Sequence, residues 1–207
     1  MSILFFGDSL TEGSNSSMRY TDFLPPEWDV WNLAVSGTTI GEYSIYPVDG
    51  NSLLGLIGKH TQEIRNSDLI FIEYGSNDIS AIMCGFATVQ TVVVSFVKAV
   101  DWIKQINPKV RIVFLTFGSK EIILDRARRM SKYLEEEYFK SFNFKFPTSL
   151  YYDAYTKLMD NIGKVCDTMF MLPDELVEDK YISDDGIHPN EKGHELIAKK
   201  LLAQLTF

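Results

Sequence analysis

A serine, a histidine and a carboxylate stand in this chain in settings that could support nucleophilic catalysis. Ser9 lies in Gly7-Asp8-Ser9-Leu10, directly after a short apolar run, and His188 lies in a loop with Asp185 three residues before it. A carboxylate that orients an imidazole through Nδ1 leaves Nε2 free to take a proton from a serine hydroxyl. Each segment alone is also typical of an ordinary capped turn, so both interpretations stay open at this point.

Two further polar segments, predicted to be loops, follow apolar runs and contain glycine. These are Ser36-Gly37 and Gly75-Ser76-Asn77-Asp78. Glycine permits a close approach of the backbone or a positive φ, and asparagine supplies an amide donor. Such groups could hold an oxyanion, although the same residue types are also preferred in turns.

The remaining histidines and the cysteines suggest no second site. His60 falls in the apolar stripe of a predicted helix, which indicates a core or boundary residue, and His194 lies in the closing helix, where it could be exposed or packed. Cys84 and Cys166 form neither a disulfide framework nor a CxxC zinc pattern. We therefore expect no metal and no cofactor.

Strands and helices are predicted to alternate through nearly the whole chain. The predicted strands are 2–6, 29–33, 68–74, 110–117 and 167–172, and the predicted helices are 52–65, 89–106, 151–165 and 191–205. This alternation predicts a single domain, 1–207, with a three-layer α/β/α architecture and a doubly wound, parallel, five-stranded sheet. Parallel strands end at one edge, so the polar segments that follow them should converge there.

The region from Ser119 to Pro147 is predicted to be less regular. It contains a basic cluster and a run of aromatic residues, the latter being Tyr138, Phe139, Phe142, Phe144 and Phe146. We expect the aromatic residues to belong to the core; the alternative is that they form a wall or a lid of the pocket. We expect the basic cluster to form a solvated face; the alternative is that it attracts an anionic substrate. Its members are Arg126, Arg128, Arg129 and Lys132.

Charge and composition exclude several classes of function. The chain of 207 residues has 45% hydrophobic and 23% charged residues, with a net charge of −8. Its pI of about 4.9 argues against a nucleic-acid partner. The chain opens with neither a signal-peptide pattern nor an apolar run long enough for a membrane span, which leads us to expect a cytoplasmic protein.

Taken in order, four short blocks resemble those of the SGNH (GDSL-type) hydrolases. They are Gly7-Asp8-Ser9-Leu10, Asn32-Leu-Ala-Val-Ser-Gly37, Gly75-Ser76-Asn77-Asp78 and Asp185-Gly186-Ile187-His188-Pro189. One such block is weak evidence, whereas the ordered set spans positions 7 to 189 and covers essentially the whole chain. The resemblance implies the flavodoxin-like fold of that family.

The resemblance also implies a role for each site residue. Ser9 would be the nucleophile, His188 its base and Asp185 the acid that orients the base; Gly37 and Asn77 would complete an oxyanion hole with the Ser9 N–H. The implied activity is metal-independent hydrolysis of a carboxylic ester through an acyl-enzyme. The substrate would be a small-molecule, carbohydrate or lipid ester, such as a short-chain or acetyl ester.

Other functions stay open at the level of sequence. Thr11 stands where the α/β-hydrolase elbow Gly-x-Ser-x-Gly would have its second glycine, so that family is not matched. The same site could serve an acyltransferase or a thioesterase. Outside this class, the alternatives are an inactive binding module and a metal-dependent phosphoesterase with Asp8, Asn77, Asp185 and His188 as ligands, although the chain has only three histidines.

Overall fold

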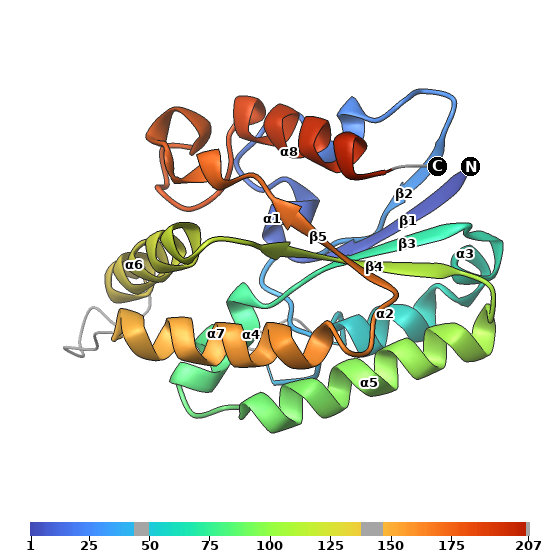
Figure 1. The fold of residues 1–207 in the computed structure, drawn as a ribbon, viewed down its shortest axis with the longest axis horizontal. Helices are drawn as coiled ribbons and strands as arrows, with labels where there is room; N and C mark the ends of the chain where they lie inside the picture. Colours follow the sequence, from blue (N-terminus) through green and yellow to red (C-terminus); the bar gives the residue numbers. More distant parts are fainter. Residues whose placement is uncertain (44–49, 138–146, 206–207) are drawn as a thin grey trace.

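The protein is described by a computed structural model over residues 1–43, 50–137 and 147–205. Five parallel strands form one sheet in the order β2-β1-β3-β4-β5 (Figure 1). The strands are β1 (Ser2–Gly7), β2 (Asp29–Asn32), β3 (Leu69–Glu73), β4 (Arg111–Phe117) and β5 (Thr168–Leu172). The predicted parallel five-stranded sheet is therefore confirmed.

Helices cover both faces of this sheet. Figure 1 shows α8 on one face and α2, α4, α5 and α7 on the other, with α6 beyond one end of the strands. The helices are α1 (Ser9–Glu12), α2 (Leu53–Lys59), α3 (Thr61–Asn66), α4 (Ser76–Met83), α5 (Val89–Ile106), α6 (Lys120–Glu137), α7 (Thr148–Ile162) and α8 (Glu191–Gln204), and the 3₁₀ helices are η1 (Tyr20–Phe23), η2 (Asp174–Val177) and η3 (Asp179–Tyr181). The three-layer architecture predicted from the sequence is confirmed.

The central strands are apolar on both faces because helices bury both. Residues Ile3 to Phe6 of β1 and Leu69 to Ile72 of β3 are almost fully buried. Phe5 and Phe71 stack across the two strands, with ring centroids 4.8 Å apart and an interplanar angle of 10°. Continuous apolar runs of this kind are typical of parallel sheets.

The order of the strands reverses direction between β1 and β3. The chain leaves β1 to form β2 on one side and then returns to form β3 on the other, with Gly7 in register with Glu73. In an open α/β sheet the crevice outside the carboxyl ends at such a point is the usual ligand site. The segments that begin at Asp8 and at Tyr74 therefore leave the sheet side by side.

Outside the active site, two predictions of secondary structure were wrong. The single helix predicted over 52–65 is two helices, α2 and α3, because His60 adopts a non-helical φ of −120° and ψ of 39° between them. The half-buried side chain of His60 agrees with the predicted boundary position.

The region after Ser119 also differs from its prediction. Residues 120–137 form the regular helix α6, whose buried stripe includes Ile122, Ala127 and Leu134. Arg126 interrupts this stripe with a charge although it is itself buried, which hid the helical period in the sequence. The aromatic residues predicted as core, pocket wall or lid lie at 138–146, outside the described residues.

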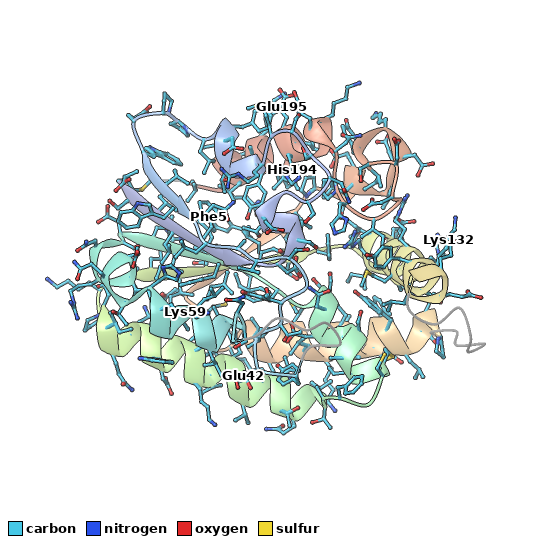
Figure 2. All side chains as sticks on the ribbon, turned by 180° about the vertical axis from the view of Figure 1, so that it is seen from behind. Phe5, Glu42, Lys59, Lys132, His194 and Glu195 are labelled. Atoms are coloured by element: carbon cyan, nitrogen blue, oxygen red, sulfur yellow. The ribbon has the colours of Figure 1, made fainter. Side chains whose placement is uncertain are left out.

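His194 is buried on the sheet-facing side of α8, whereas its neighbour Glu195 points away from the sheet (Figure 2). His194 Nδ1 accepts a hydrogen bond of 3.2 Å from Tyr20 N, and the two rings stack at 6.1 Å. Burial lowers the pKa of His194 to about 4. The sequence left open whether this residue is packed, and the structure shows that it is.

The lowered pKa predicts a loss of stability in acid. An unfolded chain binds a proton at His194 near pH 6.5, whereas the folded chain resists it down to about pH 4, so stability falls as the pH drops through this window. Between pH 7 and 4.5 the wild type should lose about 2 kcal/mol more than His194→Gln. Urea unfolding of both proteins at the two pH values measures this, and equal losses would contradict the prediction.

Candidate active site

Ser9 is the first residue of the short helix α1, directly after β1. Asp8 caps this helix: its Oδ1 accepts a hydrogen bond of 3.0 Å from Leu10 N. The capping interpretation of the sequence therefore holds for Asp8. It does not hold for Ser9, whose Oγ lies 2.8 Å from His188 Nε2.

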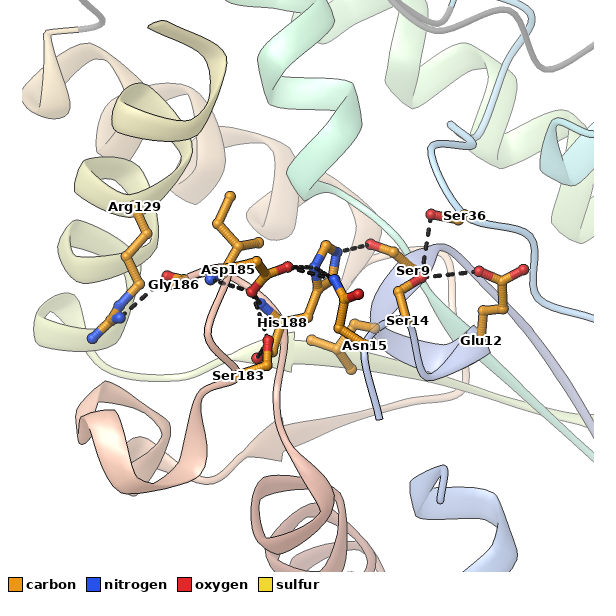
Figure 3. Close-up of polar contacts among 12 residues, drawn as sticks. Ser9, Glu12, Ser14, Asn15, Ser36, Arg129, Ser183, Asp185, Gly186 and His188 are labelled. Atoms are coloured by element: carbon orange, nitrogen blue, oxygen red, sulfur yellow. Dashed lines mark hydrogen bonds and ion pairs between the residues drawn. The ribbon is translucent and has the colours of Figure 1, made fainter. Parts of the chain in front are cut away.

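His188 belongs to a tight loop between η3 and α8. Ile182 pairs with Pro189 in an antiparallel bridge, and Ser183 N donates to His188 O at 2.8 Å. Gly186 turns the chain inside this bridge with a φ of +74°, a conformation that few side chains tolerate. The loop thus presents Asp185 and His188 on the same side, where the imidazole reaches Ser9 (Figure 3).

Asp185 accepts hydrogen bonds at both carboxylate oxygens. Oδ1 accepts from Ser183 Oγ at 2.6 Å and from the backbone N–H groups of Ile187 and His188 at 2.9 and 3.0 Å. Oδ2 is hydrogen-bonded to His188 Nδ1. Partial burial by itself would raise the pKa of Asp185, but these hydrogen bonds outweigh it and hold the pKa well below the usual range. Asp185 is therefore an anion at neutral pH, fixed against the imidazole.

Asn15 also contacts the Asp185–His188 pair, and the sequence analysis did not single it out. Its Nδ2 donates to Asp185 Oδ2 at 2.7 Å (Figure 3). Its φ of +61° is the left-handed conformation that asparagine adopts more readily than most residues. That preference is the only signal in the sequence that could have marked Asn15.

Asn77 is the second residue of α4, where the sequence predicted a loop. Gly75 precedes it with a φ of +132°, and the helix starts at Ser76. The Asn77 amide Nδ2 donates to Thr38 O at 2.9 Å and to Asp8 Oδ2 at 3.2 Å. Asn77 therefore lies beside the residue that caps the Ser9 helix, and its amide also contacts the segment that follows Gly37.

Gly37 lies in the turn after β2 and has a φ of +75°. The neighbouring segment is tied to α4 by Asp78, whose Oδ1 accepts from Ile40 N at 3.0 Å and from Tyr43 Oη at 3.1 Å. Burial raises the pKa of Asp78 to about 7. The structure thus brings the Gly37 turn, α1 and α4 to the same edge of the sheet, as the strand pattern predicted.

A second carboxyl group lies under the site and was not singled out from the sequence. Glu73, the last residue of β3, is 3% exposed, and Asp8 is 2% exposed. Thr11 Oγ1 donates to Glu73 Oε2 at 3.2 Å. Burial raises the pKa of both acids, and the charge of Asp8 raises the pKa of Glu73 further. The signal in the sequence that could have marked Glu73 is an acidic residue at the end of an apolar strand.

The proposed metal ligands of the alternative function do not gather into one site. Asp8 bonds to Leu10 and Asn77, while Asp185 bonds within its own loop and to Asn15. Within residues 1–43, 50–137 and 147–205, no group of three or more His, Cys, Asp or Glu side chains could hold a metal ion.

The basic cluster on α6 divides into two pairs. Arg128 and Lys132 are exposed, as the solvated-face interpretation predicted. That interpretation was wrong for Arg126, which is 7% exposed, and for Arg129, whose side chain is 17% exposed. These two arginines contact the Asp185–His188 loop.

Residues 5–196 match the family model of the GDSL-like Lipase/Acylhydrolase family. The chain belongs to this family. No curated protein matches the sequence. The resemblance to the SGNH hydrolases stated from the four blocks is therefore confirmed for this GDSL-like chain.

Solved structures share the fold of this GDSL-like protein. The lipase Lip_vut3 from a goat rumen metagenome is 14% identical, with a TM-score of 0.64 over 98% of this chain and 96% of that one. Est24, a carbohydrate acetylesterase from Sinorhizobium meliloti, is 20% identical, with a TM-score of 0.61 over 99% of each chain. The acetyl xylan esterase AlAXEase is 14% identical, with a TM-score of 0.60 over the full length of both chains.

The family acts on ester substrates, so the GDSL-like chain is an ester hydrolase in this general sense. Nothing in its described part suggests a membrane-spanning segment: no helix there is both long and apolar enough.

Proposed function

We propose that the protein hydrolyses carboxylic esters through an acyl-enzyme formed on Ser9. The observation that carries this proposal is the chain of contacts from Ser9 Oγ through His188 to Asp185, with Nε2 2.8 Å from the hydroxyl and Nδ1 bonded to the carboxylate. In this arrangement the anionic Asp185 holds the imidazole in the tautomer that accepts the serine proton.

The reaction has two steps. Ser9 Oγ attacks the ester carbonyl carbon and gives its proton to His188 Nε2; the intermediate then collapses, and the alcohol leaves with that proton. A water molecule next attacks the acyl carbonyl, passes its proton to Nε2, and the acid leaves as Ser9 Oγ recovers the proton. The N–H groups of Ser9 and Gly37 and the Asn77 amide would stabilise the oxyanion of each intermediate.

Asn77→Ala should lower kcat by about 10²–10³-fold with a smaller effect on KM, because an oxyanion donor acts mainly on the transition state. The substrate oxygen must compete with Thr38 O and Asp8 Oδ2 for the Asn77 hydrogens. Steady-state kinetics with p-nitrophenyl acetate measures both constants. A change confined to KM would contradict the oxyanion role.

The polar surroundings of Ser9 support a short or acetyl ester as substrate. Ser14 Oγ lies 3.0 Å from Glu12 Oε2 and 3.3 Å from Ser36 Oγ, and Asn15 borders the same side of the site (Figure 3). Hydroxyl, amide and carboxylate groups suit a hydrated substrate such as an acylated sugar better than a long acyl chain. Acetylesterases among the proteins of similar fold agree with this choice.

A fluorophosphonate probe tests the proposed nucleophile, and a series of p-nitrophenyl esters from acetate to palmitate tests the substrate, alongside an acetylated sugar and an acyl-CoA. We expect labelling of Ser9 and the highest kcat/KM on acetyl esters. Absence of labelling would favour an inactive binding module. Loss of activity with EDTA would favour a metal-dependent phosphoesterase, and a preference for acyl-CoA would favour a thioesterase. Transfer of the acyl group to an added alcohol would indicate an acyltransferase with the same site.

A further inference from the structure

Two arginines from α6 reach the backbone of the loop that carries Asp185 and His188. Arg126 Nη1 donates to Ile187 O, and Arg129 Nη1 donates to Gly186 O at 3.2 Å. Figure 3 shows Arg129 extending from α6 toward Gly186. The two carbonyl groups belong to adjacent residues, and Ile187 directly precedes His188. Ile187 is 3% exposed, so its carbonyl lies where an unpaired acceptor would be costly.

Arg126 is held more tightly than a surface arginine. It is 7% exposed, and its guanidinium lies over the ring of Phe117, the last residue of β4, at 5.5 Å from the centroid. Its charge lowers the pKa of both Asp8 and Glu73 against the raising effect of burial. A buried cation thus contacts both the end of β4 and the loop of His188.

This position excludes a direct role in binding the substrate through Nε. Arg126 Nε is shielded from solvent and contacts no acceptor within the part of the chain that the structure describes. Arg126 Nη1 instead donates to a backbone carbonyl, that of Ile187. The hydrogen bond from Arg126 to the site therefore runs through Ile187.

The geometry points to Arg126 as the residue that positions His188 for proton transfer from Ser9, by fixing the carbonyl of Ile187. This inference rests on the proposed function. The loop has its own bonds on the Asp185 side. On the side of α6, Arg129 bonds to Gly186, and Arg126 bonds to Ile187, the residue directly before His188. Small displacements of a catalytic group cost about 10²-fold in rate, so a mobile Ile187 would weaken the alignment of Nε2 with Oγ.

The test uses the full chain and p-nitrophenyl acetate. Arg126→Met keeps the length and packing of the side chain but removes its charge and donors; the control is Arg128→Met, since Arg128 is 65% exposed and lies on the same helix. We expect Arg126→Met to lower kcat by about 10–100-fold with KM changed little, and Arg128→Met to match the wild type. Circular dichroism and urea unfolding give the folded fraction to which kcat is referred.

A double-mutant cycle distinguishes positioning from general destabilisation. If Arg126 acts through His188, Arg126→Met should alter the residual rate of His188→Ala by less than about two-fold. Effects that multiply in full would overturn the inference, as would a folded Arg126→Met with the kcat of the wild type. Should Arg126→Met fail to fold, Arg126→Gln, which is shorter and neutral, replaces it with the same expected loss.

The failure of this inference is distinguishable from failure of the proposed function. A wild-type protein that neither hydrolyses the ester nor reacts with the fluorophosphonate contradicts both. An active, labelled wild type with an equally active Arg126→Met contradicts only the role of Arg126.

Discussion

Ser9→Ala and His188→Ala should each lower kcat for ester hydrolysis on the order of 10⁵–10⁶-fold, the largest effects expected in this protein. Without Ser9 Oγ there is no nucleophile for the acyl group, and without His188 no base lies within 2.8 Å of that hydroxyl. Because the two residues act as a unit, the double variant should be no slower than either single one. Single-turnover and steady-state assays with p-nitrophenyl acetate measure the three rates.

The fold should survive both substitutions. The cap of α1 comes from Asp8, so Ser9 contributes no side-chain bond to the helix ends. Ser17→Ala serves as the matched control, because it removes an exposed hydroxyl of the same segment that bonds to Glu191 and has no contact to His188. Near-wild-type turnover in folded Ser9→Ala would contradict the mechanism. A control variant that loses as much activity as Ser9→Ala would also contradict it.

Asp185→Asn should lower kcat by about 10⁴-fold, the second largest effect. The asparagine keeps the shape of the side chain, but only one of its two terminal atoms can accept hydrogen bonds. Asp185 accepts from Ser183, Ile187 and His188 N at one oxygen and from Asn15 and His188 Nδ1 at the other. An amide group must therefore face donors on one side, which favours the wrong imidazole tautomer or moves the ring away from Ser9.

Asp184→Asn provides the control for this substitution, since Asp184 is the exposed neighbour in the same loop. Its activity should equal that of the wild type. Because the pKa of Asp185 lies well below its usual range, the wild-type rate should show no titration of this group from pH 5 to 9. Asp185→Asn with a kcat within about ten-fold of the wild type would contradict the orienting role, since loss of this role should cost about 10⁴-fold.

The parts of the fold that the sequence predicted are those with local signals. Each strand is an apolar run ended by glycine or by polar residues, and alternation with helices implies parallel strands that end at one edge. Ser9, Gly37 and Asn77 follow three such strands, so their convergence could be predicted before their contacts were known. His188 was placed by the composition of its loop and by Asp185 three residues earlier.

The contacts that support these residues could not be predicted because they depend on distant segments. Arg126 binds a carbonyl 61 residues away, and Asn15 binds a carboxylate 170 residues away. In the sequence Arg126 belongs to a run of charges that is typical of a solvated helix face. Only the packing of α6 against the rest of the molecule distinguishes Arg126 from Arg128.

The bond between Ser9 and His188 joins positions 179 residues apart. At a synthesis rate of about 5–20 residues per second, a ribosome would add the serine to the chain roughly 10–40 s before the histidine. During that interval the nascent chain has a nucleophile but no base, so it cannot acylate itself on cellular esters. Ester hydrolysis during refolding should likewise appear only with the final docking of the C-terminal segment, which makes the activity a direct measure of complete folding.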